Sequence, residues 1–374
     1  MTIPAVTVTW ATNSDGTVQA SWTAETPFDE YTVVLDGATT LVKGTSTGKL
    51  PGNVAHSITV TPSAADATAA SATFTPSSGG GTFKAPLSGL LDRKGVKPAY
   101  TWMQGGVLNT TWAALQSSPN GPLNTGVIDQ AIATGKPFKL RLEPDGGGAP
   151  AFAKSVAGFS PVTVSGAQGQ SCTVGPFWRA DYIALWESFV HALGAKYDTT
   201  PTLREIIMGG MGLCYSEPML RYSTSALQAA GLTVALDEAA FAAMLGIFKA
   251  ACPTTLLDLT CNPAPLEGLA WTLSFMTEAR TQLGKQCVLG NNSLRAPVAS
   301  LGTQYAAMYA AQQKLGPPIY YQTATPSRVG DMATCLASAV GYGANSVELP
   351  SGYQTNYPEA VLQAAQAKLI GNPV

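Results

Sequence analysis

The sequence predicts a multidomain protein in which a small antiparallel β-sandwich precedes a larger (β/α)8 barrel. Residues 1–77 contain short alternating strands and no helical periodicity, which is typical of an all-β domain. Residues 78–83 are rich in Gly and have the composition of a flexible linker. From residue 84 to residue 374, apolar runs alternate with helical stretches, a pattern that favours a parallel sheet covered by helices.

The composition excludes several classes of function. The 374 residues include 21 Lys and Arg against 23 Asp and Glu, and this net charge of -2 offers no basic surplus for a nucleic acid. The two histidines, His56 and His191, lie far apart, so a histidine zinc site or a Ser-His-Asp triad is not expected. We therefore expect neither a metal nor a cofactor, and chemistry based on carboxylates, amides and aromatic side chains.

Cysteine usage and apolar segments bear on the compartment in which the protein works. The six cysteines form no CxxC pair, and we expect them to be buried free thiols in a protein made in a reducing cytosol. Residues 1–10 lack the basic and apolar segments of a signal peptide, and no run of 18 apolar residues predicts a membrane span. We expect such a protein to leave a cell only by lysis or within a particle.

Residues 1–77 carry evenly spaced strands separated by turn signals such as Asp36-Gly37. Trp22 and the run 31–35 resemble the second and third strands of a fibronectin type III domain, an immunoglobulin-like sandwich. In that family a tyrosine usually stands near the position of His56, and we expect His56 to be a packing residue rather than a ligand. The predicted strands are 6–11, 18–24, 31–35, 40–43, 56–62 and 72–75.

The second part of the chain alternates between strands and helices. Residues 180–197 carry an apolar stripe at helical spacing, which is typical of a helix packed on a sheet. Seven clear strands in strict alternation predict a (β/α)8 barrel; a doubly wound sheet is the alternative, but no Gly-rich phosphate loop follows its first strand. The expected strands are 99–104, 138–143, 205–210, 254–260, 286–290, 319–323 and 346–349, and the expected helices are 124–134, 180–197, 236–251, 266–283, 298–315, 331–340 and 358–370.

Polar side chains follow the predicted strands at their carboxyl ends, where the functional groups of a barrel gather. Carboxylates can do acid/base work on a sugar, amides can bind its hydroxyls, and aromatic rings can stack on its faces. The sequence therefore predicts a carbohydrate site at one mouth. Its candidate residues are Glu143, Asp145, Tyr215, Glu217, Asn262, Asn291, Asn292, Gln322, Glu348 and Tyr353.

Residues 99–350 resemble the clan A glycoside hydrolases, and the segments that carry the resemblance are 112–115, 127–142 and 180–218. The resemblance places a poorly defined first strand near 87–97 and makes 205–218 the fourth strand, which ends in Asn-Glu-Pro in that clan. It implies that Glu217 is the acid/base that protonates the departing glycosidic oxygen. Ser216 stands here in place of the asparagine that binds the sugar.

The resemblance also implies a glutamate nucleophile at the end of the seventh strand, where this chain has Gln322. An amide cannot form a glycosyl-enzyme, and the alternative carboxylates are Glu348 on the eighth strand and Glu143. A carboxylate pair separated by about 5 Å would predict retention of configuration, and one separated by about 6.5–9.5 Å inversion. Because an unpaired buried carboxylate is costly, a buried ion pair of Glu348 with Arg141 stays open beside a catalytic role.

The combination of modules resembles a minor tail protein of a phage that infects actinobacteria. This resemblance implies a virion tail-tip protein whose barrel recognises, and could hydrolyse, a host envelope polysaccharide. Its other partners would be tail proteins in a symmetric assembly. Two alternatives stay open: an active glycoside hydrolase with Glu217 as acid/base and Glu348 as its partner, and a purely structural tail subunit with a degenerate barrel.

Overall fold

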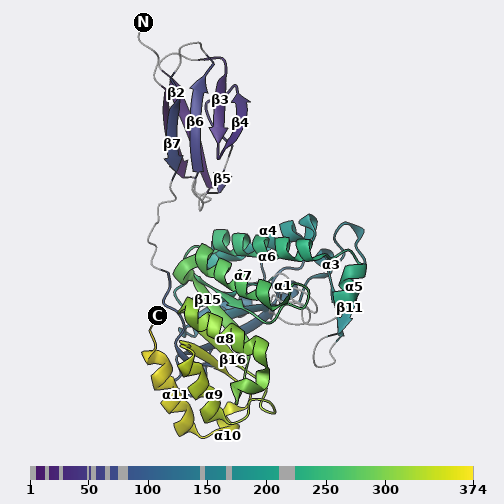
Figure 1. Cartoon of the computed structure of the whole chain (residues 1–374), viewed down its shortest axis with the longest axis vertical. Helices are drawn as coiled ribbons and strands as arrows, with labels where there is room; N and C mark the ends of the chain where they lie inside the picture. Colours follow the sequence, from purple (N-terminus) through teal and green to yellow (C-terminus); the bar gives the residue numbers. More distant parts are fainter. Residues whose placement is uncertain are drawn as a thin grey trace. The chain divides into compact units, whose positions relative to one another are not determined.

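The computed structural model describes residues 6–12, 17–24, 28–48, 50–51, 56–63, 68–74, 83–143, 148–165, 171–209 and 224–373. The chain divides into two compact units, Met1–Gly81 and Thr82–Val374 (Figure 1). The first unit contains strands only among its described residues, whereas the second contains both helices and strands. Each unit is described by itself.

The N-terminal unit consists of two antiparallel sheets. One has the strand order β1-β2-β5 and the other the order β4-β3-β6-β7. The predicted strands are present, and the largest shifts are those of the strands predicted at 40–43 and 72–75, which begin two residues earlier; the short β5 was not predicted. The observed bounds are β1 (Val6–Thr12), β2 (Thr17–Ala24), β3 (Tyr31–Leu35), β4 (Ala38–Val42), β5 (Leu50–Pro51), β6 (His56–Pro62) and β7 (Ala70–Phe74).

Alternating burial builds the core of this unit. Every second residue of β6 is buried, as two-residue periodicity requires of a half-buried strand, and Trp22 lies with Tyr31 in the same core. His56 is 5% exposed and its ring stacks on Trp10 with centroids 6.0 Å apart. Its Nδ1 lies 2.6 Å from Oδ2 of Asp36. His56 is therefore a packing residue, as the sequence predicted.

The second unit is a closed barrel of eight parallel strands in the order β10-β13-β14-β15-β16-β17-β8-β9. Closure between β8 and β9 distinguishes it from a doubly wound sheet, and the predicted (β/α)8 barrel is confirmed. The strands are β8 (Gly89–Asp92), β9 (Gly105–Thr111), β10 (Phe138–Glu143), β13 (Leu203–Ile207), β14 (Leu256–Thr260), β15 (Cys287–Leu294), β16 (Ile319–Thr323) and β17 (Ser346–Leu349).

Helices surround the barrel in Figure 1. The predicted helix 180–197 has those bounds, and the predicted helix 298–315 is broken at Gly302, which has a φ of 86° that favours glycine. The helices are α1 (Trp112–Leu115), α2 (Gly126–Ala133), α3 (Ala151–Lys154), η1 (Val156–Gly158), α4 (Ala180–Tyr197), α5 (Thr224–Ala229), α6 (Val234–Ala251), α7 (Gly268–Leu283), η2 (Gly284–Gln286), η3 (Val298–Leu301), α8 (Thr303–Leu315), α9 (Met332–Gly341), α10 (Tyr353–Asn356) and α11 (Glu359–Gly371).

The predicted strand 99–104 is wrong, because these residues form turns and a loop between β8 and β9. The loop contains Tyr100 and Trp102, whose rings stack with centroids 5.1 Å apart. An apolar run of this kind has the composition of a strand, which explains the wrong prediction. β9 starts instead at Gly105 and Gly106, where a Cβ atom would lie 2.1 Å and 1.8 Å from backbone oxygens. The first strand expected near 87–97 is present as β8.

The barrel unit begins at the end of the barrel opposite the carboxyl ends of the strands. Lys84 donates its backbone N–H to the carbonyl of Thr254 and its Nζ to the carbonyl of Leu203, at 3.0 and 2.8 Å. These acceptors lie at the amino ends of β14 and β13. Burial lowers the pKa of Lys84 to about 8. The segment that follows the linker is thus fixed across the base of the barrel, and the mouth lies at the other end.

Candidate functional site

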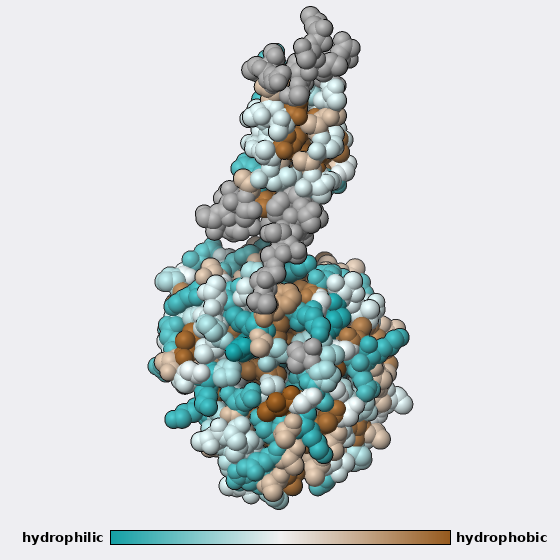
Figure 2. All heavy atoms as spheres, turned by 90° about the vertical axis from the view of Figure 1, so that its left-hand side faces the viewer, coloured by the Kyte–Doolittle hydropathy of each residue, from teal (hydrophilic) through white to brown (hydrophobic). Residues whose placement is uncertain are grey.

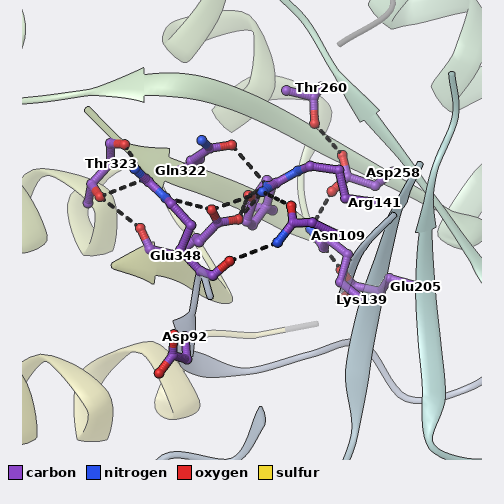
Figure 3. Close-up of polar contacts among 12 residues, drawn as sticks. Asp92, Asn109, Lys139, Arg141, Glu205, Asp258, Thr260, Gln322, Thr323 and Glu348 are labelled. Atoms are coloured by element: carbon purple, nitrogen blue, oxygen red, sulfur yellow. Dashed lines mark hydrogen bonds and ion pairs between the residues drawn. The ribbon is translucent and has the colours of Figure 1, made fainter. Parts of the chain in front are cut away.

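The barrel interior contains a lower layer of charged side chains. Lys139 on β10 is completely buried, and its Nζ pairs with Oε2 of Glu205 at 3.0 Å and with the carboxylate of Asp258 (Figure 3). The same Nζ lies 3.0 Å from the ring centroid of Tyr320. Burial raises the pKa of Glu205, against the charge of Lys139. A lone buried ion would be very costly, so each charge in this layer depends on the others.

An upper layer surrounds Glu348 on β17, nearer the carboxyl ends of the strands. Arg141 donates from Nη1 to Oε1 of Glu348 at 3.1 Å and from Nη2 to Oε2. Arg93 donates Nε to Oε1 at 2.8 Å, and the Tyr320 hydroxyl donates to Oε2 at 2.5 Å. Both carboxylate oxygens therefore accept two bonds each, and the side chain is completely buried. The ion pair with Arg141 that the sequence left open is present.

The charges around Glu348 keep it ionised. Burial alone would raise the pKa of its carboxyl group, but the charges of Arg141 and Arg93 and the hydrogen bonds outweigh that effect and lower the pKa to about 2. Tyr320 shows the opposite shift, because burial and the neighbouring carboxylate raise the pKa of its hydroxyl well above the usual value. At neutral pH Glu348 is thus a charged acceptor and Tyr320 a neutral donor.

The upper layer closes into a ring of hydrogen bonds. Asn109 accepts from Nη1 of Arg141 at 3.2 Å and donates to the carbonyl of Arg93 at 2.9 Å. Gln322 Oε1 accepts from Nη2 of Arg141 at 2.9 Å, and Thr323 accepts from Arg93. These residues come from five consecutive strands, which we call the bonded arc: β16, β17, β8, β9 and β10. The other three strands, β13, β14 and β15, form the opposite arc.

Two asparagines at the ends of adjacent strands in the opposite arc differ in their partners. Asn291 on β15 is fully buried and donates to the carbonyl of Cys261 at 2.8 Å, and its Oδ1 accepts from the Tyr309 hydroxyl and from the Ser293 N–H. Asn262 is 1% exposed, and neither its Oδ1 nor its Nδ2 has a hydrogen-bond partner. Asn291 therefore serves the fold, and Asn262 has unused bonding capacity.

The other predicted residues that the structure describes are spread around the mouth. Tyr353 is 1% exposed, donates to Oδ2 of Asp92 at 2.8 Å and lies outside the ring. Asn292 is half-buried and accepts from the Ser293 hydroxyl at 3.2 Å. Glu143 is half-buried at the end of β10. The structure thus joins Gln322 to Glu348 through Arg141 and does not bring Tyr353 to them.

Three predicted residues lie outside the described part of the chain: Asp145, Tyr215 and Glu217. Their roles, and the separation between Glu217 and Glu348, stay predictions. Ser216 also lies outside it.

Two long connections lie between β10 and α6. The one after β10 contains α3, η1 and the hairpin β11 (Val162–Ser165) to β12 (Ser171–Val174), and the one after β13 contains α5, which lies beside β11 (Figure 1). Cys172 on β12 is disulfide-bonded, which corrects the expectation that the cysteines are free thiols. That expectation holds for the buried thiols of Cys252, Cys261, Cys287 and Cys335. Cys172 lies on a strand of this hairpin, and the spacing of the cysteines in the sequence does not indicate that position.

A pair of carboxyl groups lies where α6 and α7 begin. Asp237 in the first turn of α6 is 1% exposed and interacts with Glu267, the N-cap residue of α7. Burial and the neighbouring Glu267 raise the pKa of Asp237 to about 9. Oδ1 of Asp237 and both oxygens of Glu267 have no donor on any other residue. A hydrogen bond between two carboxyl groups requires a proton on one of them, and the raised pKa of Asp237 assigns that proton to Asp237 at neutral pH.

Sequence reasoning missed most of the residues that form the two layers. Asn109 lies on β9 and Arg93 directly follows β8, the two strands whose positions were least clear, and Glu205 and Asp258 stand inside apolar runs. One signal was available: Lys139 and Arg141 alternate with apolar residues in 138–143, so that all the charges of this strand face one side. The residues that pair with Lys139 and Arg141 could be found only from the strand register.

The described part of the mouth offers hydrogen-bonding groups and no free carboxylate pair. Among the described residues, no group of three or more His, Cys, Asp or Glu could hold a metal ion, and no helix is long and apolar enough to cross a membrane. Figure 2 shows hydrophilic and apolar side chains interspersed over the visible face of the barrel unit.

No family model matches the sequence, and no curated protein does so. Similar solved structures include the catalytic domain of a β-amylase from Paenibacillus polymyxa, with 9% identity over 70% of this chain and 91% of that chain, and a TM-score of 0.46. Aspergillus fumigatus Ega3 in complex with galactosamine has 8% identity over 72% of this chain and 94% of that chain, with a TM-score of 0.42.

Endo-glycoceramidase II from Rhodococcus sp. in a cellobiose-like isofagomine complex is also similar. It has 11% identity over 66% of this chain, with a TM-score of 0.40. The chain spans 65% of that protein's length. These similarities are weak, and the barrel architecture follows from the strand register of the chain itself.

Proposed function

We propose that the barrel recognises a polysaccharide of a host cell envelope and does not cleave it with Glu348 as nucleophile. The observation that carries this proposal is the state of Glu348: fully buried, with both oxygens engaged by Arg141, Arg93 and Tyr320. A glycosidase nucleophile needs a carboxylate oxygen free to approach the anomeric carbon. Glu348 would have to give up at least two charge-assisted hydrogen bonds to do so.

Gln322 supports the same proposal. It occupies the strand position at which the clan A resemblance implies a nucleophile, and its carbonyl oxygen accepts from Arg141. An amide cannot form a covalent glycosyl-enzyme, so this position offers no nucleophile. A barrel without a nucleophile on β16 or β17 is suited to bind a sugar without retaining cleavage, and Glu217 stays a predicted acid/base.

For the N-terminal unit we propose a fibronectin type III-like sandwich over residues 1–77, joined by the linker 78–83 to a barrel over 84–374. Support comes from two antiparallel sheets of three and four strands with Trp22 and Tyr31 in one core. Such a module can anchor a barrel to a larger assembly without taking part in its chemistry.

We further propose that the protein is a minor tail protein of a phage and works in the virion, in a symmetric assembly with other tail proteins. The disulfide of Cys172 fits a protein that works outside a reducing cytosol. The barrel unit also begins at its base, with Lys84 fixed to β13 and β14, so within this unit the mouth lies at the opposite end from Lys84.

The test is to incubate the full chain with purified envelope polysaccharides of candidate actinobacterial hosts. Retention of the protein on an immobilised polymer is measured beside released sugars, detected by mass spectrometry. We expect retention without release. Release that disappears in Glu217→Gln would overturn the proposal in favour of an active hydrolase, and neither retention nor release would leave a structural subunit.

A further inference from the structure

We infer that the ligand binds on the opposite arc of the mouth, that the Asn262 amide is its anchoring contact, and that the bound group is a pair of hydroxyls on an uncharged sugar. This inference rests on the proposed carbohydrate recognition and adds the position of the ligand and its chemical class. It follows from which polar side chains around the barrel are hydrogen-bonded within the protein and which side chain has no partner.

The bonded arc has used its oxygen acceptors. Both oxygens of Glu348, the amide oxygen of Gln322 and the amide oxygen of Asn109 accept bonds from Arg141 or Arg93. A sugar hydroxyl that approached Glu348 would have to replace a charge-assisted bond, which is the stronger kind, and one that approached Gln322 or Asn109 would share an oxygen that already accepts from a guanidinium group. Binding on this side of the mouth is therefore disfavoured.

Asn262 has the reverse property. Asp258 and Thr260, four and two residues before it, point into the barrel and are bonded to each other at 3.0 Å (Figure 3). Pairing of this strand continues past its end, because the Cys261 N–H donates to the Gly290 carbonyl at 2.9 Å. Strand alternation therefore puts Asn262 on the same inner side, above the charged layers.

A buried amide without partners needs an explanation, since more than nine in ten buried polar groups in proteins are bonded. Asn262 is 1% exposed and can donate two hydrogen bonds and accept two more. Its burial also means that a ligand must displace whatever covers the amide. Neighbouring hydroxyls of a sugar match the donor and the acceptor of one amide group at the same time.

The charges nearby favour an uncharged sugar. The inward charges of the opposite arc are Glu205 and Asp258, and both are paired with Lys139 below the mouth. The described cation on these three strands, Arg204, lies at the amino end of β13 and donates to the carbonyl of Ala85 at 3.3 Å, so a uronic acid or a phosphate would find no counter-charge on the mouth side of these strands. An uncharged sugar avoids the free-energy cost of burying a charge without a counter-charge.

Two matched variants of the full chain test the inference. Asn262→Ala removes an amide that has no partner in the protein, so we expect the melting temperature to stay at or above the wild-type value. We expect binding to a purified neutral envelope polysaccharide to weaken roughly tenfold or more, as the loss of two hydrogen bonds implies. Asn291→Ala removes three bonds within the protein, so we expect a lower melting temperature and, in the folded protein, unchanged binding.

A periodate-oxidised sample of the same polysaccharide tests the ligand class, because periodate cleaves neighbouring hydroxyl pairs. We expect its binding to be lost. Wild-type binding by Asn262→Ala, or a melting temperature lowered as in Asn291→Ala, would overturn the role of Asn262 and leave the proposed function intact. Full binding of the oxidised polymer would overturn the hydroxyl pair. A wild-type protein that binds no polysaccharide would overturn the proposed function and this inference together.

Discussion

The two arcs of the barrel mouth use polar residues for different purposes. On the bonded arc, residues from five strands satisfy one another around Glu348, and on the opposite arc Asn262 is buried with no partner at all. The same residue types therefore have different roles on the two sides. Bonding within the protein stabilises a barrel, whereas bonding capacity left unused is what a ligand can exploit.

The largest expected effect comes from breaking the bonded arc. Glu348→Gln leaves Arg141 and Arg93 buried without their counter-charge, and we expect the free energy of unfolding to fall by about 3–5 kcal/mol. Urea denaturation measures it. The control is Glu187→Gln, whose side chain is 54% exposed and should change stability by less than about 0.5 kcal/mol. Equal stability of the two variants would contradict a structural role for the ring.

Acid should weaken the bonded arc in the wild-type protein. The folded-state pKa of Glu348, about 2, lies below its unfolded value, so its contribution is present above the unfolded pKa and is lost as pH falls toward 2. The shift corresponds to about 3 kcal/mol. Urea denaturation at about pH 6 and about pH 3 should show this loss in the wild type and a smaller one in Glu348→Gln. Equal losses in the free energy of unfolding of the wild type and of Glu348→Gln would mean that other carboxylates control acid unfolding.

The stability contributed by the Asp237 and Glu267 pair, where α6 and α7 begin, should depend on pH in the other direction. The folded-state pKa of Asp237 is raised to about 9, so the stability it contributes is complete at low pH and is lost as pH rises toward that value. Asp237→Asn cannot ionise, and we expect its melting temperature near pH 8 to rise by roughly 2–4 °C, or about 1 kcal/mol, with little change near pH 4. Glu278→Gln, exposed on α7, is the control. A lower melting temperature at pH 8 would show that the ionised pair is the stable form.

The smallest effect sharpens the contrast between the arcs. Gln322→Leu removes one acceptor from Arg141, which keeps Glu348 and Tyr320, so we expect a loss of about 1 kcal/mol and no change in polysaccharide binding. Differential scanning calorimetry and a retention assay on the immobilised polymer measure the two quantities. Weaker binding would move the ligand onto the bonded arc.

Long periodic segments were predictable from the sequence, and pairings across the barrel were not. The helix 180–197 is defined by six apolar positions on one stripe, and its bounds were correct. The strand predicted at 99–104 failed because stacked aromatic residues in a loop imitate an apolar strand. Correct strand order was enough to identify the barrel even with this error.

The site was predictable only by residue type. Asn262 and Asn291 look alike in the sequence, since each ends an apolar strand, and only the register shows that Asn291 is used by Cys261, Ser293 and Tyr309. Glu348 posed the same problem, because a carboxylate in an apolar strand predicts either a catalyst or an ion pair. The two arginines that decide between these roles are separated from it by more than 200 residues in the chain.

The central claim is that the mouth binds a glycan through the opposite arc without cleaving it, and side-chain amide resonances of protein labelled with ¹⁵N-asparagine test it most directly. The probe is an oligosaccharide prepared from an envelope polysaccharide that the protein retains. We expect the Asn262 amide signals to shift on titration, those of Asn109 and Asn291 to stay, and the oligosaccharide to be recovered intact. Shifts at Asn109 with Asn262 unchanged, or a cleaved oligosaccharide, would contradict the claim.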